Sequence, residues 1–428
     1  MMLLLDLPNE VLDSIFSYSR VRELRSLILC SRHVHTLALP HLYHDINFTV
    51  RAVGINKQRS LWATRIVDRF IATLESHPER ASWVTSASLT WDKYHSDFGL
   101  SKVLGLLTSA NTITLKVELN AYPDIPSQPA APPWESEGSS SRASHLLSQS
   151  RTSRTLKSLV LDDPQTTTAD VARIMALPAL TELTIVQFNE WKSRDVFAPL
   201  QNTITPPSSN VCKLHFLNFL ASNYKISENL FKNQTQLETL TWDVMTEYKL
   251  SPSVIRGCLH HLRDNLLELH LTRAYKPDMP MLGPDSTELD VLQFSCLKVL
   301  EIHSHFLFPA IPWHDRPKGQ RDWTSSHTVD LQLSNRLPAT LEFLKIWFEY
   351  REYAFKPWKL GDESHEWIIS LAQQSQSRTP KLSNVMIIEK RWASEREWLP
   401  WVPIAEVHEP FDKAKIELEV WLRGLVDP

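Results

Sequence analysis

The first 48 residues carry apolar side chains at the spacing of short helices. The first stretch has one apolar face, formed by Val11, Leu12, Ile15 and Phe16. Pro8 suits the first helical turn, where its missing N–H would have no intrahelical partner. Two more periodic stretches follow at 24–31 and 34–39, and Pro40 is expected to end the third. The pattern predicts three helices and then an extended segment at 42–48, in a unit too small to bury much alone.

From about residue 80 the pattern changes to short alternations of apolar and polar residues. Such alternation predicts β-strands, because successive strand side chains point to opposite faces. The clearest form is Leu-x-x-Leu-x-apolar, whose six strict copies begin at Leu156, Leu180, Leu237, Leu266, Leu297 and Leu341. Weaker copies begin at Val84, Ala110, Val211 and Leu382. A motif that recurs in this way indicates a repeat protein.

The spacing of the copies resembles that of leucine-rich repeats. From 156 to 297 the motif starts are 24 to 31 residues apart, close to the ~20–29 residues of that family. Wider steps indicate insertions at 121–155, which is rich in Pro and Ser, and at 307–330, which is rich in Pro. The resemblance implies an α/β repeat fold: an N-terminal three-helix domain followed by an irregular leucine-rich-repeat solenoid.

The predicted domain boundaries follow these changes of pattern. Residues 1–48 form the three-helix domain, 49–80 a helical connector, and 81–404 the solenoid with its two insertions. Residues 405–428 are expected to cap the last repeat. We expect 121–155 to be a flexible loop that trypsin cuts first, because its composition cannot offset the entropy of ordering the chain.

Composition argues against several classes of function. The chain has 9 glycines in 428 residues, and none are spaced as in a P-loop, a dinucleotide-binding fingerprint or a nucleophile elbow. A net charge of −4 gives no electrostatic basis for binding nucleic acid or an anionic membrane. The four cysteines are at least 38 positions apart, so there is no Cys-x-x-Cys pair. No uncharged apolar stretch reaches the ~18 residues of a membrane span.

Candidate metal-binding and catalytic groups are weak. The histidines at 33, 35, 41 and 44 are close in sequence, but helix positions 33 and 35 point about 200° apart, and no cysteine or carboxylate has ligand spacing with them. Nothing marks a nucleophile on a strained turn. We therefore expect no metal, no cofactor and no catalysis, in a protein of the cytoplasm or nucleus; a hydrolase on a repeat scaffold is a remote alternative.

Three N-terminal segments carry a more specific resemblance. They are LPNEVLDSIF at 7–16, LRSLILCSR at 24–32 and ALPHLY at 38–43. Together they resemble the F-box, in the fungal version whose third helix runs into a Pro-x-Leu-Tyr segment. The F-box is a docking module. The resemblance implies binding to the Skp-type adaptor of cullin–RING ubiquitin ligases, while the C-terminal domain captures a protein substrate.

Carried over residue by residue, the resemblance assigns one set of apolar residues to the adaptor interface: Leu7, Pro8, Leu12, Ile15 and Phe16, together with Leu24 and Leu27. It implies that Leu24, Leu27 and Leu29 divide between that interface and the small core. An exposed apolar helix face on a very small domain is typical of a protein-binding surface. The leading hypothesis is a substrate-recognition subunit of a Skp–cullin–F-box ligase. The alternative is an F-box protein that binds the adaptor without directing ubiquitination.

Strand alternation identifies the surface available to a substrate. In Leu-x-x-Leu-x-Leu strands the leucines point to the core, so the residues between them face the other side of the sheet. On the last repeats these positions bring charges and a large aromatic onto adjacent strands. The predicted substrate-binding residues are His215, His270, Glu301, His303, Lys345 and Trp347. The substrate itself is an unidentified protein.

Overall fold

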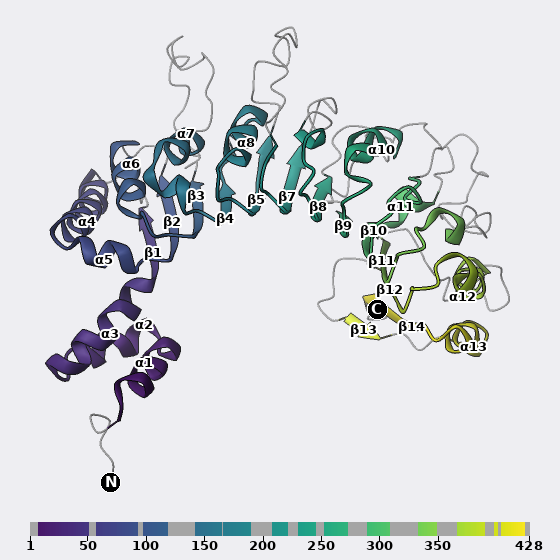
Figure 1. Cartoon of the computed structure of the whole chain (residues 1–428), viewed down its shortest axis with the longest axis horizontal. Helices are drawn as coiled ribbons and strands as arrows, with labels where there is room; N and C mark the ends of the chain where they lie inside the picture. The colour runs from purple at the N-terminus through teal and green to yellow at the C-terminus, as the bar shows by residue number, and fades with distance from the viewer. Residues whose placement is uncertain are drawn as a thin grey trace, which may run out of the picture. The chain divides into compact units, whose positions relative to one another are not determined.

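The computed structural model describes residues 7–50, 57–92, 97–118, 142–164, 166–189, 208–220, 230–244, 252–272, 289–308, 333–348, 366–389, 398–400 and 404–423. The chain divides into two compact units. Unit 1 comprises Met1–Gln187 and Lys192–Asp195, and unit 2 comprises Phe188–Trp191 and Val196–Pro428. Unit 1 begins with helices, and both units contain parallel strands connected by helices (Figure 1).

Unit 1 begins with three short helices, α1 (Asn9–Tyr18), α2 (Val21–Leu27) and α3 (Arg32–His44). Local hydrogen bonds help to set where the second and third helices begin. The Glu23 carboxylate accepts from the backbone N–H of Arg20 at 2.8 Å. The Ser31 hydroxyl accepts from the backbone N–H of Val34 at 3.1 Å. These bonds satisfy donors that a first helical turn leaves without an intrahelical partner.

Helix α3 continues past Pro40, so the expectation that this proline ends the helix is wrong. An internal proline costs ~3 kcal/mol, because it removes a backbone hydrogen bond and crowds the preceding turn. Contacts beyond Pro40 offset this cost. Tyr43 lies edge-on to Trp83 with ring centroids 6.3 Å apart, and the His44 ring nitrogen Nε2 is 2.9 Å from the Thr85 hydroxyl. The extended segment therefore begins three residues later than predicted.

The described strands of unit 1 are parallel and lie in sequence order: β1 (Asp45–Val50), β2 (Ser86–Asp92), β3 (Thr112–Glu118), β4 (Ser158–Asp162) and β5 (Glu182–Ile185). Parallel neighbours require a crossover connection. The helices of these connections are α4 (Lys57–Ser76), α5 (Pro78–Trp83), α6 (Asp97–Leu106), α7 (Arg142–Gln149), the 3-10 helix η3 (Arg151–Arg154) and α8 (Thr168–Met175). Strand β1 starts before residue 48, so the sheet begins inside the range predicted for the three-helix domain.

Unit 2 contains a second run of strands: β6 (Phe188–Asn189), β7 (Lys213–Leu220), β8 (Thr239–Val244), β9 (Glu268–Thr272), β10 (Val299–His303), β11 (Phe343–Phe348), β12 (Asn384–Glu389), β13 (Trp398–Pro400) and β14 (Glu417–Arg423). All pair in parallel except β13, which pairs antiparallel with β14 at an open edge. Its helices are α10 (Pro252–Leu259), η6 (His260–Leu262), α11 (Ser304–Leu307), η10 (Leu333–Arg336), α12 (Glu366–Arg378) and α13 (Ala405–Ala414). Among the described helices of the chain, none is long and apolar enough to cross a membrane.

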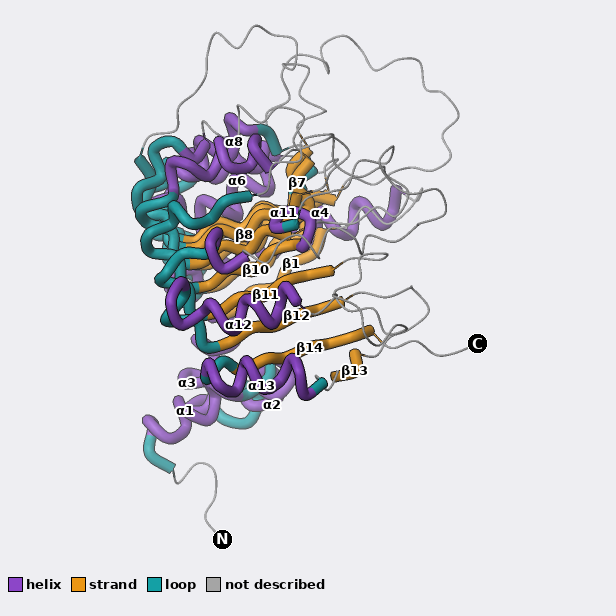
Figure 2. Tube along the Cα trace, turned by 90° about the vertical axis from the view of Figure 1, so that its right-hand side faces the viewer, coloured by secondary structure: helices purple, strands orange, loops and turns teal. Residues whose placement is uncertain are grey.

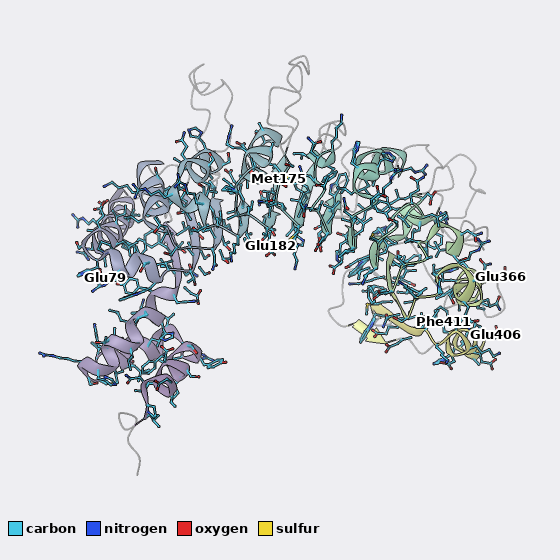
Figure 3. All side chains as sticks on the ribbon, in the orientation of Figure 1. Glu79, Met175, Glu182, Glu366, Glu406 and Phe411 are labelled. Carbon is cyan, nitrogen blue, oxygen red and sulfur yellow. The ribbon has the colours of Figure 1, made fainter. Side chains whose placement is uncertain are left out.

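In each unit the helices that connect successive strands lie along one face of the strands, and the described connections place no helix on the other face (Figures 1 and 2). In unit 1, Met175 of α8 is fully buried on the helix side, whereas Glu182 of β5 is on the opposite side (Figure 3). In unit 2, Phe411 of α13 is buried, and Glu366 and Glu406 are exposed at the starts of α12 and α13 (Figure 3). The core of each unit therefore lies between strands and helices.

The leucine motif explains which strand face is buried. In all six strict copies the first leucine precedes a strand and is fully buried. The next two apolar residues lie within the strand and are also buried, as in Leu159 and Leu161 of β4. The weaker copies starting at Val84, Ala110, Val211 and Leu382 occupy the same positions at β2, β3, β7 and β12. Each fully buried leucine contributes about 2 kcal/mol.

The expected loop at 121–155 is folded in its second half. Residues 142–154 form α7 and η3, whose buried side chains include Ala143, Ser144, Leu147 and Thr152. The flexible-loop prediction is wrong for this part, because its small and apolar side chains pack against neighbouring helices. Residues 121–141 lie outside the described residues, and so do 309–330 of the other predicted insertion.

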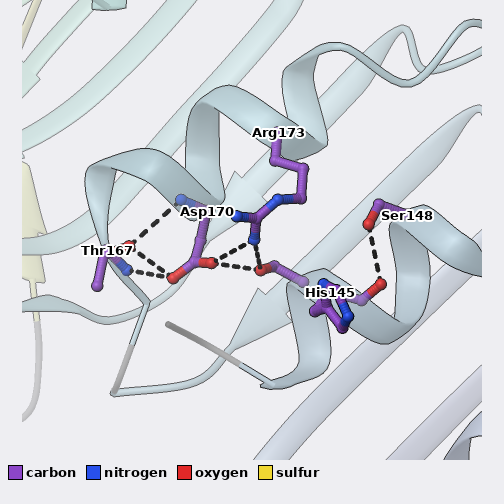
Figure 4. Close-up of polar contacts among 6 residues, drawn as sticks. His145, Ser148, Thr167, Asp170 and Arg173 are labelled. Atoms are coloured by element: carbon purple, nitrogen blue, oxygen red, sulfur yellow. Dashed lines mark hydrogen bonds and ion pairs between the residues drawn. The ribbon is translucent and has the colours of Figure 1, made fainter. Parts of the chain in front are cut away.

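A buried carboxylate connects α7 to α8 (Figure 4). Asp170 is fully buried and accepts hydrogen bonds from the Ser144 hydroxyl at 2.5 Å and from the Thr167 hydroxyl at 2.7 Å. Its other partners are the Thr167 N–H at 2.9 Å and the Arg173 guanidinium at 3.0 Å. A buried carboxylate is stable only when its oxygens are paired in this way. This network holds α7 in a fixed position against α8.

We predict that Asp170→Ala releases α7. The substitution leaves the Ser144 hydroxyl and the Thr167 N–H without their acceptor, which costs about 2 kcal/mol. The melting temperature should fall, and trypsin should cut at Arg151 and Arg154 earlier than in the wild type. Asp68→Ala, at an exposed position of α4, is the matched control. Unchanged melting and unchanged protection of Arg151 in Asp170→Ala would contradict this role.

Candidate protein-interaction sites

The three N-terminal helices enclose a small apolar core. Its buried members come from all three helices: Leu12, Phe16, Leu24, Val34 and Ala38. Leu7, Leu27, Ile28, Leu37 and Leu42 are partly buried against this core. A hydrogen bond of 2.7 Å between His41 Nε2 and the Asp13 carboxylate also connects α3 to α1. The core uses only one face of α1.

A neighbouring face of α1, about 100° around the helix from Leu12 and Phe16, is apolar and exposed. Val11 is 42% exposed, Ile15 38% and Tyr18 89%. These residues are three and four positions apart, so they lie on one side of the helix. Val21, 46% exposed, follows at the start of α2. We call Val11, Ile15, Tyr18 and Val21 the exposed stripe; the exposed Pro8 precedes it at the start of α1.

The predicted adaptor-binding residues divide between this surface and the core. Pro8 and Ile15 are exposed, and Leu7 and Leu27 are partly buried. Leu12, Phe16 and Leu24 are 0–2% exposed and lie in the core of the domain rather than on its surface. They point inward because a domain of this size needs them for its core. The prediction left out Val11, Tyr18 and Val21; of the residues that it divided between interface and core, Leu24 is buried and Leu29 is 83% exposed.

A helix-by-helix reading of the sequence could have found the missing residues. Val11, Ile15 and Tyr18 have the same spacing as an ordinary buried face, and so does the pair Leu12 and Phe16. Two apolar faces on one helix indicate that one of them is left for another molecule.

The family comparison bears on this region alone. Residues 4–49 match the model of the F-box-like family. The N-terminal helices are an F-box-like domain. The match covers about a tenth of the chain, and it agrees with the resemblance found in the sequence. A search of curated proteins finds no match to the chain.

The F-box-like domain is attached to the strands of unit 1 through the end of α3. The Arg80 guanidinium of α5 lies 5.6 Å from the centre of the Tyr43 ring. The backbone N–H of Thr85 donates to the carbonyl of His44 at 3.1 Å, just before β2. Helix α3 ends at His44 and β1 begins at Asp45, so no loop separates the helices of the domain from the first strand.

A second candidate site lies on the helix-free face of unit 2, around Glu301. The strand register puts His270 of β9, Glu301 of β10 and Lys345 of β11 side by side. One Glu301 oxygen is 2.8 Å from His270 Nδ1, and the other is 3.0 Å from Lys345 Nζ. Trp347 Nε1 also donates to Glu301 at 2.6 Å, and the Lys345 ammonium lies 4.5 Å from the centre of the Trp347 ring. We call these four residues the Glu301 cluster.

The contacts of the Glu301 cluster shift two pKa values in opposite directions. The hydrogen bond to Glu301 raises the pKa of His270 above 6.5, against the opposing effect of burial. Burial raises the pKa of Glu301, but the hydrogen bonds from His270, Lys345 and Trp347 outweigh it and lower the pKa to about 2. The cluster therefore holds an ion pair between Glu301 and Lys345, and its carboxylate favours the protonated form of His270.

Two other predicted substrate-binding residues lie outside this cluster. His215 of β7 hydrogen bonds through Nδ1 to the Thr241 hydroxyl at 2.8 Å. His303 is only 1% exposed, so its predicted role at the surface is wrong. It is covered because α11 begins at the next residue, with His303 as its N-cap. Among the described residues, no group of three or more His, Cys, Asp or Glu could hold a metal ion.

We predict that two neighbouring substitutions in α1 differ strongly in their effect on the stability of the domain. Leu12→Ala removes a fully buried side chain and should cost about 3 kcal/mol. Hydrogen exchange of peptides from 9–44 should then become fast. Val11→Ala, one residue away on the exposed face, should change stability by less than about 0.5 kcal/mol and leave exchange unchanged. Equal exchange rates in the two variants would contradict the assignment of core and surface.

The Glu301 cluster gives a testable pH dependence. The raised pKa of His270 contributes stability at pH values below 6.5, and this is lost as the pH rises through the higher folded-state pKa. The lowered pKa of Glu301 contributes stability above pH 4.5, and this is lost as the pH falls toward 2. Both contributions are complete between pH 4.5 and pH 6.5.

We expect Glu301→Gln to lower the pKa of His270, measured by NMR from the ring proton signal that His270→Asn removes. The decrease follows because the carboxylate that stabilises the imidazolium is lost while burial remains. Glu268→Gln is the matched control: its carboxylate is farther from the ring, at 3.7 Å, and its effect should be smaller. The same His270 titration in wild type and Glu301→Gln would contradict the ion pair.

Proposed function

We propose that this chain is a substrate-recognition subunit of a Skp–cullin–F-box ubiquitin ligase. F-box domains generally bind Skp-type adaptors. In this proposal the F-box-like domain binds the adaptor, the adaptor connects it to a cullin, and the helix-free strand face holds a protein substrate. The chain itself performs no catalysis and works in the cytoplasm or nucleus.

The observation that carries this proposal is the exposed stripe. Val11, Ile15, Tyr18 and Val21 are each at least 38% exposed, although the domain to which they belong has a very small core. Large apolar side chains that gather on one surface mark an interaction site. They are the side chains best placed to contact an adaptor, together with Pro8. Leu12 and Phe16 support this surface from inside rather than contributing to it.

We also propose that the strands and helices beyond the F-box-like domain are degenerate leucine-rich repeats, in a solenoid of the kind that fungal F-box proteins carry. The support comes from the leucine motif, whose ten copies all precede or lie on parallel strands with their apolar positions buried. Each repeat then consists of one strand and the connection that follows it, as a stack of similar units requires. Such a stack leaves the opposite strand face for a substrate.

We predict that the double substitution Val11→Ser and Ile15→Ser removes adaptor binding. Interface anchors of this kind contribute about 2 kcal/mol each, so the loss should exceed a hundredfold in affinity (about 3 kcal/mol or more). The measurement is pull-down of purified Skp-type adaptor by the full chain. Leu292→Ser is the matched control, because Leu292 is also an exposed apolar residue, 52% exposed, but lies in unit 2.

Undiminished adaptor binding by the double variant would contradict the adaptor-binding role of the exposed stripe. Hydrogen exchange of peptides from 9–44 checks that the domain stays folded. Co-purification of a cullin with the wild type supports the ligase. Adaptor without cullin supports the alternative, an F-box protein that binds the adaptor without directing ubiquitination.

A further inference from the structure

The helix-free face of unit 2 ends in a compact group of nine residues on β11, β12 and β14. The strand register arranges them in three rows across the strands: Phe343, Asn384 and Glu417; Lys345, Met386 and Glu419; Trp347, Ile388 and Trp421. We call these nine residues the terminal patch. With neighbouring strands ~4.8 Å apart and ~3.3 Å per residue, the patch spans roughly 10 Å by 13 Å. This size suits a short extended peptide segment.

The centre of the terminal patch is apolar and aromatic. Trp347 and Trp421 flank Ile388 in the last row, and Met386 lies next to Ile388 on β12. Both tryptophans and Met386 are half-buried, and Ile388 is 8% exposed. Tryptophan and methionine are enriched at protein interfaces, and tryptophan is frequent among the residues that dominate binding energy.

The same face in unit 1 has a different composition. Two corresponding rows on β2 to β5 also contain Val160 and Glu182, but consist mostly of small hydroxyl residues: Ser86, Thr112, Ser158, Ser88, Thr114 and Thr184. These six side chains are half-buried and offer little apolar area. A strand face that needs only to be soluble can therefore be built in this chain without tryptophan. The aromatic residues of the terminal patch require another explanation.

The charges of the terminal patch are unequally compensated. Lys345 is paired with Glu301, 3.0 Å away on β10. On β14, Glu417 accepts a hydrogen bond from the Asn384 amide at 3.1 Å, and Glu419 accepts one from Trp421 Nε1 at 3.1 Å. These two donors are neutral, so they orient the carboxylates without cancelling their charge. Among the described side chains of the patch, the β14 side is consequently acidic.

We propose that the terminal patch binds an extended segment of a partner protein in which a lysine or arginine is next to an apolar side chain. The apolar side chain lies over Met386, between the two indole rings. The cation pairs with Glu417 or Glu419 and lies against the face of Trp421, where cation–π attraction adds to the ion pair. This assignment rests on the proposed function in one respect, namely that the partner is the ligase substrate.

The probe for this proposal is a phage library of random 12-residue peptides, selected on the full-length wild-type chain. We expect enrichment of peptides with Lys or Arg beside a large apolar residue. The affinity of a selected peptide, measured by fluorescence anisotropy, should fall about tenfold or more in Glu419→Lys. Glu182→Lys is the matched control, because Glu182 lies on the corresponding face of β5 in unit 1 (Figure 3); it should bind the peptide as the wild type does.

Three results would overturn the proposal: no enrichment, enrichment of acidic or uncharged peptides, or equal binding by Glu419→Lys and Glu182→Lys. Melting temperatures of both variants check that they remain folded. The variant with Val11→Ser and Ile15→Ser should keep the peptide affinity of the wild type. Loss of adaptor binding and loss of peptide binding are thus measured separately, so failure of the ligase role is distinguishable from failure of the patch.

Discussion

The structure depends on burying one face of every parallel strand beneath helices. Parallel strands cannot be joined by tight turns, so each strand needs a long connection, and a helix in that connection provides the cover. The leucine motif meets this constraint with three buried residues per strand, one before it and two within it. The residues between them are then free of any role in the core. Their side chains can therefore differ from strand to strand. In unit 1 they are mostly serine and threonine, whereas in the terminal patch of unit 2 they include tryptophan and glutamate.

The F-box-like domain meets a different constraint, which is its small size. Helix α1 contributes Leu12 and Phe16 to the core that the three helices share, and it has further apolar residues on the neighbouring face. The domain cannot bury both faces by itself. A helix with two apolar faces therefore keeps one for folding and leaves the other to a partner. Substitutions one residue apart, such as those at Leu12 and Val11, consequently act on different properties.

The sequence predicts some parts of this structure well because those parts depend on local periodicity. The strands follow from the leucine motif, and the register of His270, Glu301 and Lys345 follows from its alignment. Other parts depend on residues distant in sequence. Ser144, within the folded segment 142–154, hydrogen bonds to Asp170, which lies in another helix. The continuation of α3 past Pro40 depends on contacts with α5 and the segment before β2. Periodicity contains no information about such partners.

In the candidate sites too, the sequence pattern predicts which residues share a face but does not predict which of them bind one another. Alternation indicates that Glu301, Lys345 and Trp347 share one face, but it does not indicate that they satisfy one another. A carboxylate that already accepts from a histidine, a lysine and a tryptophan would have to lose those bonds to pair with a partner. Such a cluster holds three strands in register more readily than it recognises a ligand. Among the described residues, Glu417 and Glu419 accept from the neutral donors Asn384 and Trp421, so a cation from outside can pair with them at a smaller desolvation cost. Recognition on this face is therefore expected at its β14 side, where charge remains uncompensated beside the aromatic residues.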